Sequence, residues 1–204
     1  MAKKDKNWMQ RHVNDRFVQE ANKEGMRSRA SYKLLQIHER DKLFRPGMNI
    51  VDLGCAPGGW SQVAKQIVGQ KGTVVGVDLL EMDPLQGVHF IKGDFQEAEV
   101  QSGLISFFDG PLDWVISDMA PNLTGHRAVD QPRAIALCEE VLYFAQDHLH
   151  PKGGLLIKTF HGEGFEEFLK MLRSTFKKVV SRKPEASRGE SREVYLLAKE
   201  FKLV

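Results

Sequence analysis

The sequence predicts an α/β fold: a Rossmann-like, doubly wound sheet of seven strands that is parallel except for an antiparallel last strand. Two observations lead to this fold class. Apolar runs bounded by glycine, proline and aspartate alternate with helical stretches along the 204 residues, which is the order that a doubly wound sheet requires. The runs are continuously apolar rather than alternating, as expected where helices cover both faces of a parallel sheet.

The expected elements follow one another in regular alternation. Strands are expected at residues 48–53, 73–78, 88–91, 112–118 and 155–160. Helices are expected at about residues 61–68, 96–108, 131–148 and 166–176. The last of these has one apolar face, because four apolar residues recur at helical spacing: Phe165, Phe168, Leu169 and Leu172. Gly153 and Gly154 are expected to end the long third helix before the fifth strand.

The two ends of the chain depart from this alternation. Residues 177–182 and 194–201 are predicted to be strands, and residues 183–192 between them leave no room for a helix. A hairpin is therefore expected, with one strand antiparallel to the sheet. At the other end, residues 8–43 are predicted to form two helices broken near Gly25. We accordingly divide the chain into a helical extension at 1–45, which packs on the core, and one compact domain at 46–204.

The charges are unevenly distributed along a chain whose net charge is only +2. Residues 1–40 carry 10 basic and 5 acidic side chains, residues 41–172 carry 10 and 18, and residues 173–204 carry 9 and 4. Basic ends of this kind are typical of surfaces that meet a polyanion, although two solvated faces would give the same pattern. The small total charge therefore hides an acidic middle between two basic ends.

Composition excludes several classes of protein. Two cysteines, Cys55 and Cys138, cannot build a disulfide scaffold, and no Cys or His spacing typical of a metal site occurs. No apolar run approaches the ~18 residues that a membrane helix needs. The first residues lack the apolar stretch of a secretory signal. We expect a cytoplasmic monomer with no metal and no membrane contact.

A glycine-rich turn follows the first predicted strand. Its sequence is DLGCAPGGW, and its candidate ligand-binding residues are Asp52, Gly54, Ala56, Pro57, Gly58, Gly59 and Trp60. Ligands of open α/β sheets bind at the carboxyl ends of the strands, and glycines let the backbone approach a ligand closely. A plain tight turn between strand and helix is the alternative.

Acidic residues at the ends of the next two strands favour a ligand that contains adenosine. Asp78, which is followed by Leu79, can accept hydrogen bonds from two ribose hydroxyls. Asp94 can face an adenine amino group, with Phe95 beside the ring. Three acids at successive strand ends, counting Asp52, are more than a plain turn requires.

The composition of the turn decides between two classes of cofactor. A dinucleotide site usually has the pattern Gly-x-Gly-x-x-Gly, whereas here Ala56 takes the second position and Pro57 lacks an amide donor. S-adenosylmethionine carries no phosphate, and its α-amino group could be oriented by an acid such as Asp52. The turn therefore favours S-adenosylmethionine over the nicotinamide cofactor of a dehydrogenase.

The most distinctive stretches of the chain are DLGCAPGGWS at 52–61, SDMAPN at 117–122, KTFHGEGF at 158–165 and SRGESREVY at 187–195. Together they resemble the FtsJ/RrmJ family of ribose 2′-O-methyltransferases. The likeness runs from about residue 8 to residue 198, and Cys55 and His161 stand where Ala and Gln are more usual. It implies a class I methyltransferase fold and S-adenosylmethionine as methyl donor. The implied substrate is a uridine of 23S ribosomal RNA in the assembled large subunit.

The resemblance also implies a catalytic set of four charged residues: Lys33, Asp118, Lys158 and Glu193. Lys158 would be the general base for the ribose hydroxyl, which requires that its ammonium first lose a proton. A nearby Lys33 would favour that loss, whereas Asp118 would oppose it, so the better role for Asp118 is orientation. Glu193 could balance Lys33 and hold the ribose. Taken singly, each residue could equally be an ordinary surface charge.

Basic residues from both ends of the chain are expected to flank the carboxyl edge of the sheet as an RNA-binding rim: Arg27, Arg29, Arg182, Lys183, Arg188 and Arg192. Phosphates would bind this rim, while the 2′-hydroxyl selects RNA over DNA. Two alternatives stay open within this reading. The substrate could be transfer RNA or an mRNA cap, or the chain could be a non-catalytic RNA-binding factor of ribosome assembly.

Overall fold

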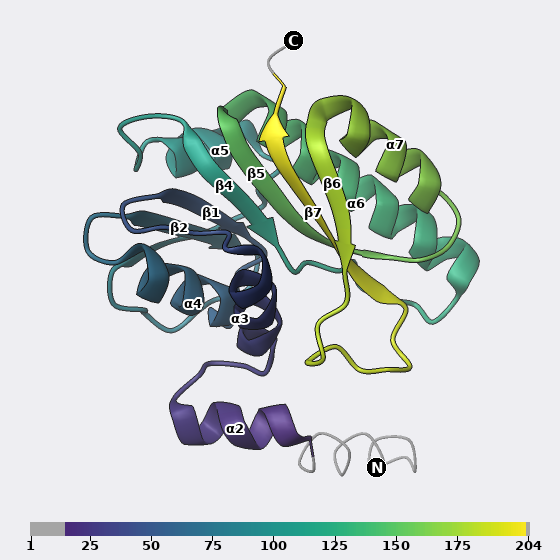
Figure 1. Ribbon diagram of the computed structural model, residues 1–204, viewed down its shortest axis with the longest axis horizontal. Coiled ribbons are helices and arrows are strands. Elements are labelled where there is room, and N and C mark those ends of the chain that lie inside the picture. Colours follow the sequence, from purple (N-terminus) through teal and green to yellow (C-terminus); the bar gives the residue numbers. More distant parts are fainter. Residues whose placement is uncertain (1–14, 203–204) are drawn as a thin grey trace.

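The computed structural model describes residues 15–202 and centres on a seven-stranded sheet with the order β3-β2-β1-β4-β5-β7-β6 (Figure 1). The strands are β1 (Asn49–Leu53), β2 (Thr73–Asp78), β3 (Val88–Lys92), β4 (Leu112–Ser117), β5 (Leu149–Phe160), β6 (Phe176–Arg182) and β7 (Glu193–Phe201). The first five pair in parallel, whereas β7 runs antiparallel between β5 and β6. The predicted fold class, with its antiparallel last strand, is confirmed.

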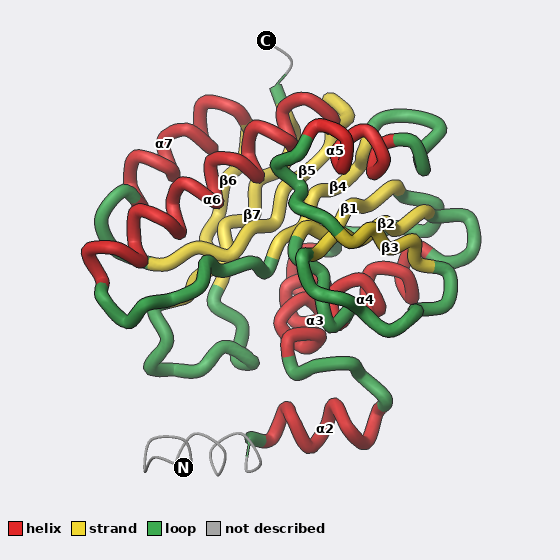
Figure 2. Tube along the Cα trace, turned by 180° about the vertical axis from the view of Figure 1, so that it is seen from behind, coloured by secondary structure: helices red, strands yellow, loops and turns green. Residues whose placement is uncertain are grey.

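Helices cover both faces of the sheet (Figures 1 and 2). They are α2 (Arg16–Glu24), α3 (Ala30–Asp41), α4 (Gly59–Val68), α5 (Ala98–Ile105), α6 (Arg127–His148) and α7 (Phe165–Thr175). α3 and α4 lie on one face, and α5, α6 and α7 lie on the other. The predicted break in the N-terminal helices is present, because Gly25 ends α2 with a φ of +67°. Residues 8–14, where that helical region was expected to begin, lie outside the described residues.

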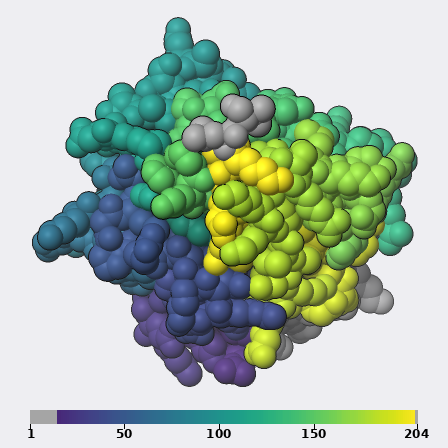
Figure 3. Space-filling view, turned by 45° about the horizontal axis from the view of Figure 1, so that its top comes forward, coloured from purple at the N-terminus to yellow at the C-terminus, as the bar shows by residue number. Residues whose placement is uncertain are grey.

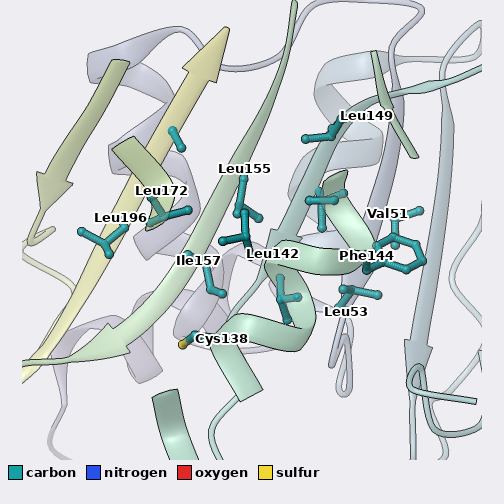
Figure 4. Close-up of a cluster of buried hydrophobic side chains, with 14 of the residues drawn as sticks. Val51, Leu53, Cys138, Leu142, Phe144, Leu149, Leu155, Ile157, Leu172 and Leu196 are labelled. Atoms are coloured by element: carbon teal, nitrogen blue, oxygen red, sulfur yellow. The ribbon is translucent and has the colours of Figure 1, made fainter. Parts of the chain in front are cut away.

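The sheet separates two apolar clusters because neighbouring residues of a strand face opposite sides. In β1, Val51 and Leu53 face the α6 side, where they join Leu142 in the cluster that Figure 4 shows. Ile50 faces the other side and joins Leu34 of α3. The continuous apolarity of the strands is therefore explained by burial on both faces.

The boundary between α6 and β5 differs from the prediction. β5 begins at Leu149, directly after the helix, so Gly153 and Gly154 lie within the strand instead of ending the helix. Gly154 pairs with Trp114 of β4, and a Cβ atom on Gly154 would lie 2.6 Å from the indole ring. These glycines therefore serve close packing within the sheet rather than helix termination.

The N-terminal helices and the β6–β7 hairpin meet at the edge of the sheet where the parallel strands end. The loop 183–192 between β6 and β7 descends beside α3 in Figure 1. Figure 3 shows the same neighbourhood as atoms, with dark blue residues of the N-terminal part lying against yellow-green residues of the hairpin. Within residues 15–202, no helix has the length and apolarity needed to cross a membrane.

Candidate active site

The turn after β1 is built from its backbone and requires glycine at two positions. Gly54 and Gly58 have φ values of +75° and +101°, a region that residues with a Cβ rarely adopt. The N–H groups of Gly54 and Cys55 donate to the Val77 carbonyl at 2.8 and 3.1 Å, which fastens the turn to β2. A Cβ atom on Gly54 would lie 1.9 Å from Cγ of Met119. Backbone contacts and close packing therefore hold the turn in one conformation.

Asp78, at the carboxyl end of β2, lies beside this turn. Its two carboxylate oxygens accept hydrogen bonds from the N–H groups of Ala56 and Leu80, at 2.9 and 2.8 Å. The next side chain, Leu79, is 65% exposed. A fixed carboxylate next to an exposed apolar side chain is an arrangement that suits a ribose and a flat ring.

Of the other predicted cofactor residues, Phe95 and Trp60 are buried and Asp94 is half-buried. Asp94 follows β3 and accepts a hydrogen bond from the Gln96 N–H at 3.0 Å, while Phe95 is only 6% exposed. Trp60, at the start of α4, is 3% exposed, and its indole N–H donates to the Ala30 carbonyl at 2.9 Å. Trp60 therefore joins α4 to α3.

Asp52 lies beneath the turn, in the layer between the sheet and α4. The residue is 1% exposed and accepts a 2.6 Å hydrogen bond from Oγ of Ser61. Burial raises its pKa to about 7; the Ser61 hydrogen bond opposes the rise, and the negative charge of Asp118 adds to it. Asp52 therefore supports the turn from below and has almost no contact with solvent.

The four charged residues expected from the resemblance converge from four separate parts of the chain. Lys33 on α3 pairs with Glu193 at the start of β7, with 2.9 Å between Nζ and Oε1. Lys158 of β5 lies 3.1 Å from Oδ1 of Asp118, which follows β4, and also donates to the Asp118 carbonyl. Nζ of Lys33 is 3.8 Å from Oδ2 of Asp118. The four residues therefore form one connected charge cluster.

The charge cluster is largely withdrawn from water. Its side chains are between 10% and 18% exposed, and its two positive and two negative charges balance. Burial by itself would raise the pKa of Glu193, but the charge and hydrogen bond of Lys33, with a further contribution from Lys158, hold that pKa below its ordinary value. Each charge depends on its neighbours, because an unpaired charge at this depth would be costly.

Sequence reasoning missed Tyr195, which lies at the centre of this cluster. Its hydroxyl donates to Oδ1 of Asp118 at 2.7 Å, and Nζ of Lys33 stands 5.5 Å from the centre of its ring. Burial, together with the negative charges of Asp118 and Glu193, raises the pKa of Tyr195 well above its ordinary value. The position two residues after Glu193 on a strand was the available signal, since such residues share one face.

Three of the basic residues expected to bind RNA are occupied within the protein. Arg27 donates to three backbone carbonyls beside the glycine turn. Arg29 binds the carboxylate of Asp15 and a carbonyl of the 183–192 loop. Arg182 makes two hydrogen bonds of 2.7 Å to Asp41 at the end of α3. Each guanidinium therefore holds two segments of the chain together.

The other three basic residues keep more of their charge at the surface. Lys183 donates to the Ser191 carbonyl at 2.5 Å, and Arg192 to the His161 carbonyl at 3.4 Å, both in exposed positions. The Arg188 side chain is 41% exposed and 3.7 Å from a carboxylate oxygen of Asp15. All three lie on or next to the 183–192 loop, beside the charge cluster.

Comparison with known proteins gives this geometry a context. A family model described as FtsJ-like methyltransferase matches residues 26–201. The chain belongs to this family. Relatives named ribosomal RNA large subunit methyltransferase E include those of Chromobacterium violaceum, 54% identical over 199 residues (97% of each chain), and Nitrosospira multiformis, 55% identical over 197 residues (96% of each).

The fold is also similar to that of a solved structure. A crystal structure of a Plasmodium falciparum protein, described as a ribosomal RNA methyltransferase, has a TM-score of 0.76 and 28% identity. The match covers 86% of this chain and 98% of that one. The chain is therefore a methyltransferase of the FtsJ-like family, and its site has to accept a methyl donor and a methyl acceptor.

Proposed function

We propose that this methyltransferase transfers a methyl group from S-adenosylmethionine to the ribose 2′-hydroxyl of a uridine in 23S ribosomal RNA of the large subunit. The observation that carries this proposal is the connected charge cluster of four residues, Lys33, Asp118, Lys158 and Glu193. The cluster adjoins the glycine turn, because Met119, the residue after Asp118, packs against Gly54. The names of the relatives support a ribosomal RNA substrate. A ribosomal substrate also supports action in the cytoplasm.

The residues around the glycine turn fit S-adenosylmethionine. Asp78, fixed by two backbone N–H groups, suits the ribose hydroxyls, and exposed Leu79 suits one face of the adenine. Gly54 and Gly58 let the backbone approach the donor, with Ala56 and Pro57 between them. When bound, S-adenosylmethionine supplies a methyl group on a positively charged sulfur. Neither Asp52 nor Trp60 offers a polar atom at the surface, so we assign both to support of the turn.

The charge cluster can remove the proton of a hydroxyl group and hold the ribose in place. Lys158 is the proposed general base: its ammonium first releases a proton to solvent, and the neutral amine, held in place by the carboxylate and the backbone carbonyl of Asp118, then accepts the proton of the ribose hydroxyl. Lys33 places a second positive charge close to Asp118 and thereby competes for its negative charge. Glu193, paired with Lys33, is available to accept a hydrogen bond from the ribose. Positioning of the two reactants accounts for the remainder of the rate.

Exposed basic residues next to the cluster suit the RNA backbone. We propose that Lys183, Arg188 and Arg192 contribute most of the contact to phosphate, because their charges are the least used within the protein. We also propose that residues 1–45 act as an extension that carries Lys33 to a methyltransferase domain at 46–204, and that the enzyme works as a monomer.

The decisive experiment measures methyl transfer from radiolabelled S-adenosylmethionine to RNA. The substrates are large ribosomal subunits from a strain that lacks the corresponding gene, free 23S RNA, transfer RNA and capped mRNA. We expect label in the large subunit, and mass spectrometry of nuclease fragments should locate it on the ribose of one uridine. Label on a base, or on transfer RNA or a cap alone, contradicts the proposed substrate. Tight RNA binding without label in any substrate would support a non-catalytic role instead.

A further inference from the structure

The pairing of Lys33 with Glu193 depends on how α3 sits against the β6–β7 hairpin. Glu193 belongs to the sheet, whereas Lys33 is carried by a helix outside it. The apolar side of α3 packs through Leu34 and Ile37 on the layer that includes α4. This packing fixes α3 against the domain, but it leaves open what holds the loop 183–192, which leads into Glu193, against the helix.

Within the loop, Ala186 is hydrogen-bonded to Gln36 of α3 and to Arg29, the residue that precedes the helix. The Ala186 N–H donates to Oε1 of Gln36 at 3.0 Å, and its carbonyl accepts from the guanidinium of Arg29. Ala186 is fully buried, so both polar groups of this residue depend on α3. Arg29, the N-cap residue of α3, has helical backbone angles, so the spacing i, i+4 and i+7 places Arg29, Lys33 and Gln36 on one side, with Lys33 in the middle.

Burial and hydrogen bonds act together in this part of the loop, because Pro184 and Ser187 are buried on either side of Ala186. A groove of about 670 Å³ lies between α3 and the start of the loop, and its walls include Gln36, Arg40, Pro184 and Glu185. The chain then turns back toward Glu193, whose own N–H is held at 3.2 Å by Oγ of Ser191. The start of the loop is also tied to α3, by the two hydrogen bonds from Arg182 to Asp41, so Ala186 is the attachment point in its middle.

We propose that Gln36, with Arg29, is a positioning residue for methyl transfer: by holding both polar groups of Ala186, it fixes the 183–192 loop so that Glu193 meets Lys33. The inference rests on the proposed function for its effect on rate. Gln36 is the sharper test of the two, because it is uncharged and its loss does not weaken attraction to phosphate. A role in RNA affinity and a role in positioning are therefore separable.

The first experiment follows the loop without any RNA. Hydrogen exchange is measured on the full-length wild type, on Gln36→Leu, which has no acceptor, and on Gln36→Glu, which keeps one. Glu39→Leu is the matched control, since it brings the same side chain to the same groove. We expect Gln36→Leu alone to lose protection at Ala186 and along the loop. Unchanged protection in Gln36→Leu overturns the inference, whatever the enzyme methylates.

The second experiment measures kcat and KM on the large ribosomal subunit. Gln36→Leu should lower kcat about tenfold, as expected for a small misplacement of catalytic groups, with KM for RNA unchanged. Gln36→Glu and Glu39→Leu should stay within about twofold of the wild type. Wild-type kcat in Gln36→Leu, or a loss confined to KM, contradicts the inference. An inactive wild type would instead contradict the proposed function, and hydrogen exchange would still decide the inference.

A double-mutant cycle tests whether Gln36 acts through Glu193. In a Glu193→Gln background, Gln36→Leu should cost little further rate, because the pair that it positions is already lost. If the two substitutions lower kcat additively, Gln36 does not act through Glu193 and the inference is contradicted. Melting temperatures of all variants are measured in parallel, and if Gln36→Leu fails to fold, Gln36→Ala takes its place as the variant without an acceptor.

Discussion

The two halves of the candidate site are built in different ways. The half beside the glycine turn comes from residues 52–95, a nearly continuous stretch, and its groups are fixed by backbone hydrogen bonds such as those to Val77 and Asp78. The half with the charge cluster draws Lys33, Asp118, Lys158 and Glu193 from four distant segments, and ion pairs hold them.

This difference indicates how each half responds to change. A turn held by its own backbone keeps its shape when one side chain is lost, so damage stays local to the ligand that the side chain contacts. The buried charges have one another as partners, so removal of one leaves others uncompensated. We therefore expect variants in the first half to change donor affinity and variants in the second half to change the rate.

The largest effect is expected from Lys158→Ala, which removes the proposed base. The rate of methyl transfer should fall about 10³-fold, while the dissociation constant of S-adenosylmethionine stays within about twofold, because Lys158 belongs to the other half. Single-turnover kinetics and calorimetry measure the two quantities. Lys178→Ala, an exposed lysine of β6, is the matched control. Near-normal turnover in Lys158→Ala contradicts the assignment of the base.

A second prediction concerns pH and the buried Asp52. Its pKa is about 7 in the folded chain against a reference of 3.8, so between these values the folded chain holds a proton that the unfolded chain has lost. Stability from this group is therefore lost as pH rises from about 4 to 7, by on the order of 4 kcal/mol. Asp52→Asn cannot ionise and should gain stability relative to the wild type over that range.

Urea unfolding of both proteins at several pH values between 4.5 and 8 measures this gain. Asp109→Asn, in an exposed loop, is the matched control, because it makes the same substitution at a position that is not buried. The two free energies of unfolding should differ more as pH rises. If the difference between Asp52→Asn and the wild type stays constant, burial of the Asp52 carboxylate does not lower stability as proposed.

Asp78→Ala should weaken binding of S-adenosylmethionine at least about tenfold, because it removes a charged acceptor from the proposed ribose site. The rate at saturating donor should change far less, in keeping with the comparison of the two halves. Glu81→Ala is the control, since its side chain is 79% exposed and pairs with Lys92 at the surface. Unchanged affinity by calorimetry in Asp78→Ala would place the ribose elsewhere.

The smallest effect separates exposed from occupied arginines. Arg192→Ala should reduce the slope of RNA affinity against salt concentration by about 1, the change expected for one lost phosphate contact. Arg182→Ala should leave that slope unchanged and lower stability, because Arg182 already binds Asp41. Affinity is measured between 50 and 200 mM salt. Equal changes of slope in the two variants would show that Arg182 also reaches phosphate. Donor binding should show almost no dependence on salt.

The sequence anticipated most of the fold, because its signals are local. Alternation of apolar strands with helices and the short connection at 183–192 were sufficient for seven strands with an antiparallel last one. The prediction was wrong at Gly153 and Gly154, because glycine is compatible with two kinds of local structure. Glycine often ends a helix, but here Gly154 is needed within a strand that packs closely against Trp114.

For the site, the sequence by itself determined which chemistry is present: the glycine turn, the acids at the strand ends and, through its motifs, the four charged residues. Only the tertiary structure decided which of these groups are buried, paired or exposed. Contacts between segments far apart in the chain bring the Tyr195 hydroxyl within hydrogen-bond distance of Asp118. Contacts of the same kind pair three arginines with other parts of the protein: Arg27, Arg29 and Arg182. Residue identity fixes what a side chain can bind, whereas the docking of helices and loops on the sheet fixes which partner lies within reach.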